Sequence, residues 1–409
     1  MTVTEEKENP PGGTARRSPV GSFVTATVSF VAVFAAGSTA IPLYGAYRSV
    51  NGVTDAGFSL VAAGYFVCAV FALLVLGRLS DHLGRKLVSI LALLLAAAGC
   101  VVLMMVDGLG PLLGGRALQG LAAGLASSAL AAFVVDTAPK RPAWLAPTVT
   151  SAGATVGLSL GVFGAGSLVQ FGPEPRHLSY ALFAAALVLC AALVASTRET
   201  VRRRRGVLAS LRPRFSLPDA ARPLLPAACG VFVSTWALGG YFTSFGPSIA
   251  ADYLGSHAPL VAAAVFASYM APSVFGGPLA GRMSPGRAQR AGMLLVAIAA
   301  LSLTGATALG SAGLFIVAGV LGGFGMGLAL SGSMASMLGH AAPVQRAGLL
   351  ALVYAISYTG SALPALLAGQ LSRATSLFGI TCGYAGLGVV ACVWVFIWSR
   401  EASARRTPR

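Results

Sequence analysis

Twelve apolar runs, each long enough to cross a bilayer, constrain this chain more than any other feature. A membrane-spanning helix needs about 20 predominantly apolar residues. Runs of this kind lie at 22–46, 57–77, 87–106, 110–134, 145–169, 178–196, 224–246, 258–280, 291–309, 312–338, 347–371 and 376–399. Of the 409 residues, 56% are hydrophobic and 10% are charged, so only short loops remain. The sequence predicts an all-α membrane protein of twelve transmembrane helices without a large soluble domain.

Lysine and arginine are distributed unequally between the two sides of these spans. The tails and the loops after even-numbered spans hold 24 of the 28, whereas the opposite loops hold only Arg48, Arg176 and Arg373. The positive-inside rule therefore places both termini in the cytoplasm and the chain in the cell membrane. The first twenty residues, with three glutamates and three prolines, predict a disordered tail rather than a cleaved signal. The net charge of +16 then reflects orientation in the bilayer, and we expect no nucleic acid partner.

The chain divides into two similar halves. The longest polar stretch, 197–223, separates a six-helix bundle at 22–196 from a second at 224–399, with tails at 1–21 and 400–409. Gly77-Arg78-Leu79 corresponds to Gly277-Pro278-Leu279, and Arg116, Gly120 and Gly124 correspond to Gly319, Gly323 and Gly327. Two pseudo-symmetric bundles of this kind are the architecture of a rocking transporter whose site lies between the halves.

The most specific segment is Gly77-Arg-Leu-Ser-Asp-His-Leu-Gly-Arg-Lys86, at the end of the second span. It resembles the signature loop of the major facilitator superfamily, and the resemblance extends over the whole chain. It implies the twelve-helix major facilitator fold and alternating-access transport.

The residue types in this loop suit a cytoplasmic gate. Gly77 and Gly84 permit unusual dihedral angles, and Asp81 can face a helix N-terminus of the other half, where the macrodipole favours a carboxylate. Arg85 and Lys86 can pair with neighbouring acids. The alternative is a basic loop that only anchors topology. In the second half Gly281 stands at the place of the acid, so a charge-based gate would be asymmetric.

Arg116 is the only charged residue deep within a span. An intramembrane arginine costs roughly 2.5–3.5 kcal/mol on insertion scales, and such residues usually face a cavity or a partner. Gln119 and Gly120 share its helix face. The segment resembles the fourth-span motif of superfamily antiporters, which implies a role in proton coupling. The alternative is an arginine that snorkels to the headgroups.

The fifth span places Gly153, Gly157, Gly161 and Ala165 at four-residue intervals, a smooth ridge for close helix packing. The segment 157–166, with Gly157, Gly161 and Gly166, resembles the antiporter motif of drug-exporting members. Val162 replaces the proline of that motif and Ala165 one of its glycines. Packing alone is the equally weighted alternative.

After the fourth span, Asp136-Thr-Ala-Pro-Lys-Arg141 resembles the superfamily's second acidic loop. We expect Asp136 to pair with Arg78, Arg85 or Arg141, and the alternative is a solvated acid that contributes little.

No acidic residue lies in the middle third of a span. A permanently cationic substrate would find no counter-charge there, which favours neutral, amphipathic or anionic molecules. A proton carrier would have to be Asp81 or Asp136, coupled to Arg116, because the four histidines also lie at span ends.

Large aromatic faces with a polar tip suit apolar ring systems. By superfamily analogy, the candidate cavity residues near mid-depth are Ser38, Trp236, Tyr241, Tyr269, Phe324, Tyr354 and Tyr358. Each could instead belong to ordinary helix packing or to the interfacial belt.

The favoured function is proton-coupled efflux of a small organic compound, such as a drug or secondary metabolite. The runner-up is an importer or facilitator of a small neutral or anionic metabolite. A membrane-bound enzyme would need paired acids, a metal cluster or an activated nucleophile, and the sequence offers none. The six cysteines lack metal-ligand spacing, so we expect no metal or cofactor. The expected partners are the small-molecule substrate, protons and the lipid bilayer, with the chain a monomer.

Both termini are expected on the cytoplasmic side. A reporter fused after Arg409 should therefore show cytoplasmic activity in intact cells, because the basic asymmetry orients the spans. A signal from the outer side would contradict the span count or the orientation.

Overall fold

The computed structural model describes residues 19–139, 141–142, 145–201, 210–211 and 217–404. Within these residues, twelve helical segments are long and apolar enough to cross a membrane. The predicted all-α fold and the predicted number of spans are thus confirmed, and the chain is a multi-pass membrane protein. Most span boundaries agree with the apolar runs to within a few residues.

The first half of the bundle comprises the first six spans with their flanking turns. Its elements are α1 (Pro19–Ala36), η1 (Ile41–Leu43), α2 (Tyr44–Asn51), α3 (Asp55–Phe71), the π-helical turn η2 (Ala72–Leu76), α4 (Leu79–Leu83), α5 (Arg85–Met104), α6 (Leu109–Leu125), the π-helical turn η3 (Ala126–Leu130), α7 (Ala131–Thr137), α8 (Leu145–Phe171) and α9 (Leu178–Ala195).

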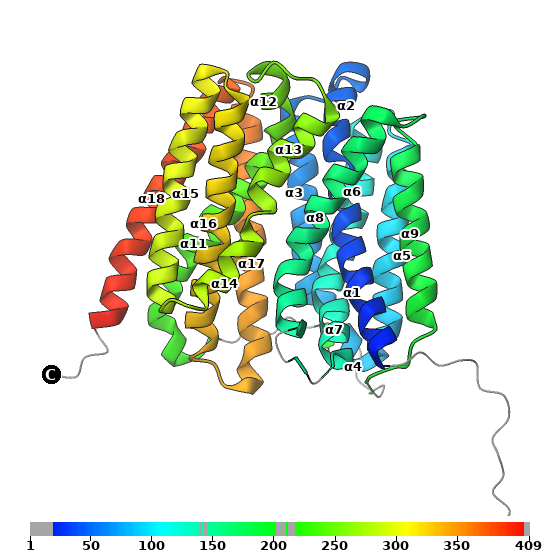
Figure 1. Ribbon diagram of the computed structural model, residues 1–409, viewed down its shortest axis with the longest axis vertical. Helices are drawn as coiled ribbons and strands as arrows, with labels where there is room; N and C mark the ends of the chain where they lie inside the picture. The colour runs from blue at the N-terminus through cyan, green and yellow to red at the C-terminus, as the bar shows by residue number, and fades with distance from the viewer. Residues whose placement is uncertain (1–18, 140, 143–144, 202–209, 212–216, 405–409) are drawn as a thin grey trace, which may run out of the picture.

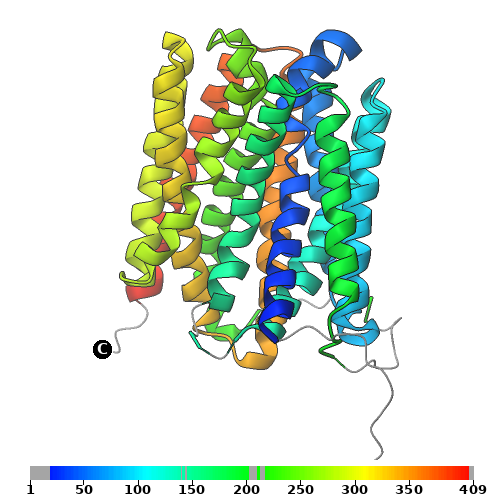
Figure 2. The same cartoon turned by 45° about the vertical axis from the view of Figure 1, so that its right-hand side comes forward.

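The second half comprises the last six spans. Its elements are η4 (Asp219–Leu224), α11 (Leu225–Ser244), α12 (Gly246–Asp252), α13 (Pro259–Met270), α14 (Ser273–Ala280), α15 (Pro285–Leu309), α16 (Ala312–Leu338), α17 (Pro343–Leu371) and α18 (Leu377–Ala404). The two halves stand side by side, and α1 begins at the same end of the bundle where α18 ends (Figures 1 and 2). We name this end the basic face and the other end the opposite face.

The halves contact one another along two pairs of helices. α3 packs against α17, and α8 packs against α13. Each hydrophobic core also reaches across: Tyr358 and Ala362 belong to the core of the first half, and Ile41 and Val162 to that of the second. The outward surface of the bundle exposes large apolar side chains such as Leu160, as expected of a surface that faces lipid.

The first span is broken, which the continuous apolar run at 22–46 did not predict. α1 ends at Ala36, and residues 37–40 form a turn before η1. The Ser38 hydroxyl donates to the carbonyl of Ala35 (3.1 Å) and the Thr39 hydroxyl to that of Ala36 (2.8 Å). Such short side chains compete with the helical backbone pattern, which explains the break beside Gly37.

The expected register between the halves is wrong at the end of the second and eighth spans. Gly277 and Pro278 lie inside α14, and Gly281 caps it, as Gly77 caps η2. Gly281 is therefore the counterpart of Gly77, four residues later than expected. α14 connects directly to α15 through residues 281–284, whereas α4 lies between η2 and α5.

The correspondence between the fourth and tenth spans is supported by helix packing. A Cβ added at Gly120 would collide with the backbone carbonyl of Tyr65, and one at Gly323 would collide with that of Tyr269. α6 therefore packs against α3 at Gly120 in the same way as α16 packs against α13 at Gly323.

Candidate functional site

Arg116 lies inside the first half, only 2% exposed. Its Nη1 donates to the carbonyl of Gly37 and to Oε1 of Gln119 (2.9 Å). Its guanidinium carbon lies 4.4 Å from the ring centroid of Tyr65. The snorkelling alternative is wrong in this structure, because the side chain points into the bundle. Among the described residues, no carboxylate forms an ion pair with Arg116.

The partners of Arg116 come from the break in the first span. A helix end leaves backbone carbonyls without intrahelical donors, and inside a membrane these must be satisfied by the protein. Gln119 Nε2 donates to the carbonyl of Ala36 (2.9 Å), beside the Gly37 carbonyl that Arg116 binds. Arg116 and Gln119 together therefore hold the end of α1, while Gly120 brings their helix against α3.

An aromatic cluster of Phe66, Trp236, Tyr354 and Tyr358 spans the contact between the halves. The ring centroids of Trp236 and Tyr358 are 4.9 Å apart, and those of Phe66 and Tyr358 are 6.0 Å apart. Tyr354 stacks on Tyr358 at 6.2 Å. Trp236 and Tyr354 are half-buried. Phe66 contacts the ring of Tyr65, so the aromatic cluster lies one residue from the Arg116 site.

The remaining expected cavity residues lie elsewhere. Tyr241 and Tyr269 are buried within the second half, where their hydroxyls bond to Thr381 Oγ1 (2.9 Å) and the Thr235 carbonyl (2.7 Å). These contacts give both tyrosines a packing role in this conformation. Ser38 donates to the carbonyl of Leu158 (2.7 Å) and ties the broken span to α8. Phe324 is half-buried on α16.

Charged side chains of the signature loop form a network on the basic face. Arg85 Nη1 lies 2.6 Å from Asp81 Oδ1, and Arg85 Nε lies 3.3 Å from Asp136 Oδ2. In this conformation Asp81 thus pairs within its own half, rather than facing a helix of the other half as expected. Asp136 contacts Arg85, one of the three expected arginines, while Arg141 is exposed.

Sequence reasoning missed Glu199 in this network. Its carboxylate accepts from the backbone N–H of Arg85 (2.8 Å) and of Lys86 (3.2 Å), the first turn of α5. A carboxylate is favourable there because of the exposed N–H groups and the helix macrodipole. Gly84, at φ 102°, brings the chain so close that a Cβ would strike Glu199. Lys86 Nζ also donates to the Thr197 carbonyl (3.3 Å).

The glycine ridge of α8 is a surface for close helix contact. A Cβ at Gly157 or Gly161 would collide with the backbone of α1, at the carbonyls of Val31 and Ala35 respectively. Gly166 instead faces α13 of the other half, where an added Cβ would lie 3.1 Å from Ala263 Cβ. The ridge therefore sits between the first span and the contact of the two halves.

Polar contacts join the halves on the opposite face. Arg48 Nη1 lies 2.8 Å from Asp252 Oδ2, which links α2 to α12. The hydroxyl of Ser248 donates to Asp55 Oδ1 (2.6 Å), and Arg48 also lies 3.9 Å from Asp55. These four side chains, here named the latch, hold the halves together on this face.

The profile of the Major Facilitator Superfamily matches residues 25–309, a range that includes the signature loop and Arg116. The chain belongs to the major facilitator superfamily. It is accordingly a membrane transporter and not an enzyme. A stretch of 100 residues is 28% identical to Myo-inositol transporter 3 of Cryptococcus neoformans var. grubii. That stretch covers 24% of this chain and only 17% of the fungal protein.

Solved structures share the fold over nearly the whole chain. A bacterial homologue of the human lysosomal transporter Spinster, inward-facing and unoccupied, superposes with a TM-score of 0.76 at 15% identity, covering 95% of this chain and 98% of that one. Its inward-facing occupied form gives a TM-score of 0.71. A variant of the nucleoside transporter NupG gives 0.65 at 14% identity, covering 92% and 99%. Likenesses at this identity establish the fold alone.

Proposed function

We propose that this superfamily member exports a small organic compound across the cell membrane in exchange for protons. The observation that supports this most is the buried Arg116, which holds the broken end of α1 beside an aromatic cluster shared by both halves. An uncompensated charge at this depth is costly to insert, and such residues usually serve an ion or substrate pathway. Coupling would follow if the movement of α1 and the protonation of Asp81 or Asp136 both act on Arg116.

The proposed mechanism is alternating access by rocking of the two halves. In the conformation described here, the latch joins the halves on the opposite face, while the charged network of the signature loop is contained in the first half. These contacts support a transporter whose opposite face is held shut and whose basic face would be open, and the inward-facing Spinster homologue is a similar structure. Rocking would break the latch and bring the two halves together at the basic face.

The proposed substrate is a neutral, amphipathic or anionic molecule with an apolar ring system. The aromatic cluster offers faces for such rings, with hydroxyls on Tyr354 and Tyr358 to orient polar groups. Every acidic residue of the described chain lies at a helix end or in a loop, so a permanent cation would lack a counter-charge at mid-depth.

The second candidate is an importer or facilitator of a small neutral or anionic metabolite. The positions of the acidic residues favour this second candidate. Proton exchange would have to use Asp81 and Asp136 at the basic face, because no carboxylate of the described residues lies deep in a span. Similar proteins include a nucleoside transporter and, over a short stretch, an inositol transporter.

The two candidates can be separated in two steps. Intracellular and extracellular small molecules are first compared between deletion and overexpressing strains to identify the compound. Its uptake into inverted vesicles is then measured with and without a proton gradient. An exporter coupled to protons should accumulate the compound only with the gradient, whereas a facilitator should equilibrate it in both cases.

Arg48→Gln should open the opposite face more often. An ion pair whose side chains are 38% and 36% exposed is worth at most about 1 kcal/mol, so the shift should be roughly two- to fivefold. Ser59 is buried on α3 where this helix meets α17. Maleimide labelling of Ser59→Cys, in a background without other cysteines, should therefore accelerate by this factor. Arg373→Gln, an exposed arginine on the same face, is the control, and equal labelling of all three proteins would exclude a latch.

Asp81→Asn should lower transport roughly fivefold at an unchanged protein level in the membrane. The substitution keeps the side-chain volume but removes one carboxylate from the Arg85 network, whose partly exposed pairs are each worth up to about 1 kcal/mol. Initial transport rates in vesicles provide the measurement. Asp107→Asn, in an exposed loop on the opposite face, is the matched control. Unchanged rates would reduce the signature loop to a topological anchor.

A further inference from the structure

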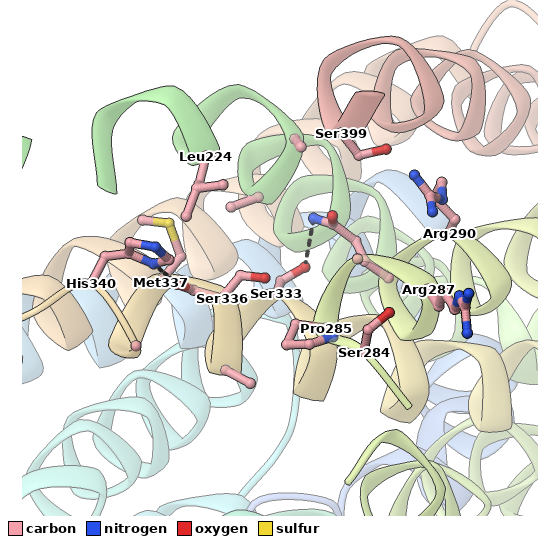
Figure 3. A pocket seen from close by; sticks show the side chains of 16 residues that line it. Leu224, Ser284, Pro285, Arg287, Arg290, Ser333, Ser336, Met337, His340 and Ser399 are labelled. Carbon is pink, nitrogen blue, oxygen red and sulfur yellow. Dashed lines mark hydrogen bonds between the residues drawn. The ribbon is translucent and has the colours of Figure 1, made fainter. Parts of the chain in front are cut away.

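A pocket of about 430 Å³ opens at the basic face of the second half, away from the aromatic cluster. It lies among the ends of α11, α15, α16 and α18, with Arg287 and Arg290 on one side and His340 on the other (Figure 3). Ser284, Ser336 and Ser399 line it between them. Its size falls in the range of about 300–1,000 Å³ found for ligand sites.

The lining of this pocket is positive. Among the residues that the structure describes, it includes two arginines and no carboxylate. It also includes the first residues of the 25-residue helix α15, whose N-terminus favours an anion. The side chain of Ser284 makes no capping hydrogen bond to that helix. Gln289 and Ser333 also line the pocket, and Gln289 Nε2 donates to Ser333 Oγ (3.0 Å).

The corresponding corner of the first half contains a carboxylate. There Glu199 accepts from the first N–H groups of α5, at Arg85 and Lys86. The two corners are built alike, because α15 packs against α16 and α18 as α5 packs against α6 and α9. Ser399 follows Glu199 by 200 residues, as Pro285 follows Arg85. The pocket thus stands where the first half supplies its own anion.

We propose that this pocket binds a phosphate group, with the headgroup of an anionic phospholipid as the occupant favoured by its position. The pocket lies at the ends of four membrane-spanning helices on the face richest in arginine, and basic pockets between helices at that level bind anionic headgroups. The phosphate would pair with Arg287 and Arg290 and lie at the N-terminus of α15, where Pro285 has no N–H and Gly286 supplies the first backbone donor. This inference concerns anchoring of the second half and does not depend on the transported substrate.

The test uses the delipidated full-length protein in detergent, with three probes: phosphatidylglycerol, phosphatidylcholine and inorganic phosphate. Native mass spectrometry measures bound lipid, and the midpoint of thermal unfolding measures stabilisation. The test variant carries Arg287→Gln and Arg290→Gln. Its matched control carries Arg282→Gln and Arg373→Gln, which remove the same charge from exposed positions outside the pocket.

Phosphatidylglycerol should bind wild-type and control proteins alike and the test variant roughly 30-fold more weakly, because two arginine contacts are lost. Ser399→Glu, which imitates Glu199, should raise the unfolding midpoint without lipid and abolish the further shift caused by phosphatidylglycerol. This variant keeps the inference testable if the double variant fails to fold.

The probes distinguish the source of the phosphate. A shift caused by phosphatidylglycerol alone identifies a lipid headgroup, and an equal shift caused by inorganic phosphate identifies a soluble anion; both support a phosphate site. Equal responses of the wild-type protein and the test variant to all three probes would overturn the proposal, as would a Ser399→Glu protein that binds phosphatidylglycerol normally.

Discussion

Arg116→Ala should strongly lower gradient-driven accumulation of the substrate while counterflow, which needs no proton gradient, remains near its wild-type rate. The substitution removes the only charge from the site at the broken end of α1 and leaves the Gly37 carbonyl without this donor. Coupling free energies between linked sites are typically 1–3 kcal/mol, so accumulation should fall by roughly 5- to 150-fold. Initial rates of both processes in the same vesicles provide the measurement.

Two companion variants make this result specific. Arg116→Lys keeps a charge but lacks the planar guanidinium group that lies against the Tyr65 ring, so it should retain only part of the coupling. Asp136→Asn should lower accumulation in the same direction if protons pass through the basic face. Equal loss of accumulation and counterflow would assign Arg116 to the substrate site or to the fold. Full proton-driven transport in both Arg116→Ala and Asp136→Asn would exclude both residues from proton coupling.

Among the glycine-to-alanine substitutions in α8, Gly161→Ala should lower the free energy of unfolding most. The new Cβ would overlap the backbone of Ala35, which cannot move without shifting α1 and the turn that Arg116 holds. Overpacking of this kind costs typically 1–3 kcal/mol. We therefore expect a clearly lower unfolding midpoint in detergent and a loss of transport.

Gly164→Ala provides the matched control on the same helix. A Cβ there would lie 3.5 Å from the Phe183 ring, an ordinary contact, so stability and transport should stay near wild type. If Gly161→Ala also behaves as wild type, the contact between α8 and α1 is looser than described. If it keeps its stability but loses transport, the ridge has a dynamic role beyond packing.

The spans were predictable because bilayer thickness fixes the length of the apolar runs. The main boundary error was α15, which begins at Pro285 rather than near 291. Hydropathy excluded Arg287 and Arg290 from the run, although proline is favourable in the first turn of a helix and arginine is tolerated at headgroup level.

The break in the first span was not predictable from hydropathy, because the run continues through it. The triplet Gly37-Ser38-Thr39 inside an apolar run was the available signal, since short hydroxyl side chains compete with the helical pattern. The position of Arg116 was predictable, but its partners were not, because the Gly37 carbonyl becomes an acceptor only when α1 ends there.

Contacts between residues distant in the sequence account for the other differences. Glu199 lies 114 residues from Arg85, and no local pattern indicated that it caps α5. Tyr241 and Tyr269 have the composition of cavity residues, yet their hydroxyls find partners inside the second half. The identity of an aromatic residue in a span does not specify which helix face it occupies, whereas the packing of neighbouring helices does.

Substrate-induced proton movement in proteoliposomes tests the central claim most directly. With the compound identified from the strains and a pH-sensitive dye enclosed, its addition should move protons in the direction opposite to its own flow, and Arg116→Ala should abolish this signal while substrate still exchanges. Substrate flow without any proton movement in the wild-type protein would contradict proton-coupled export.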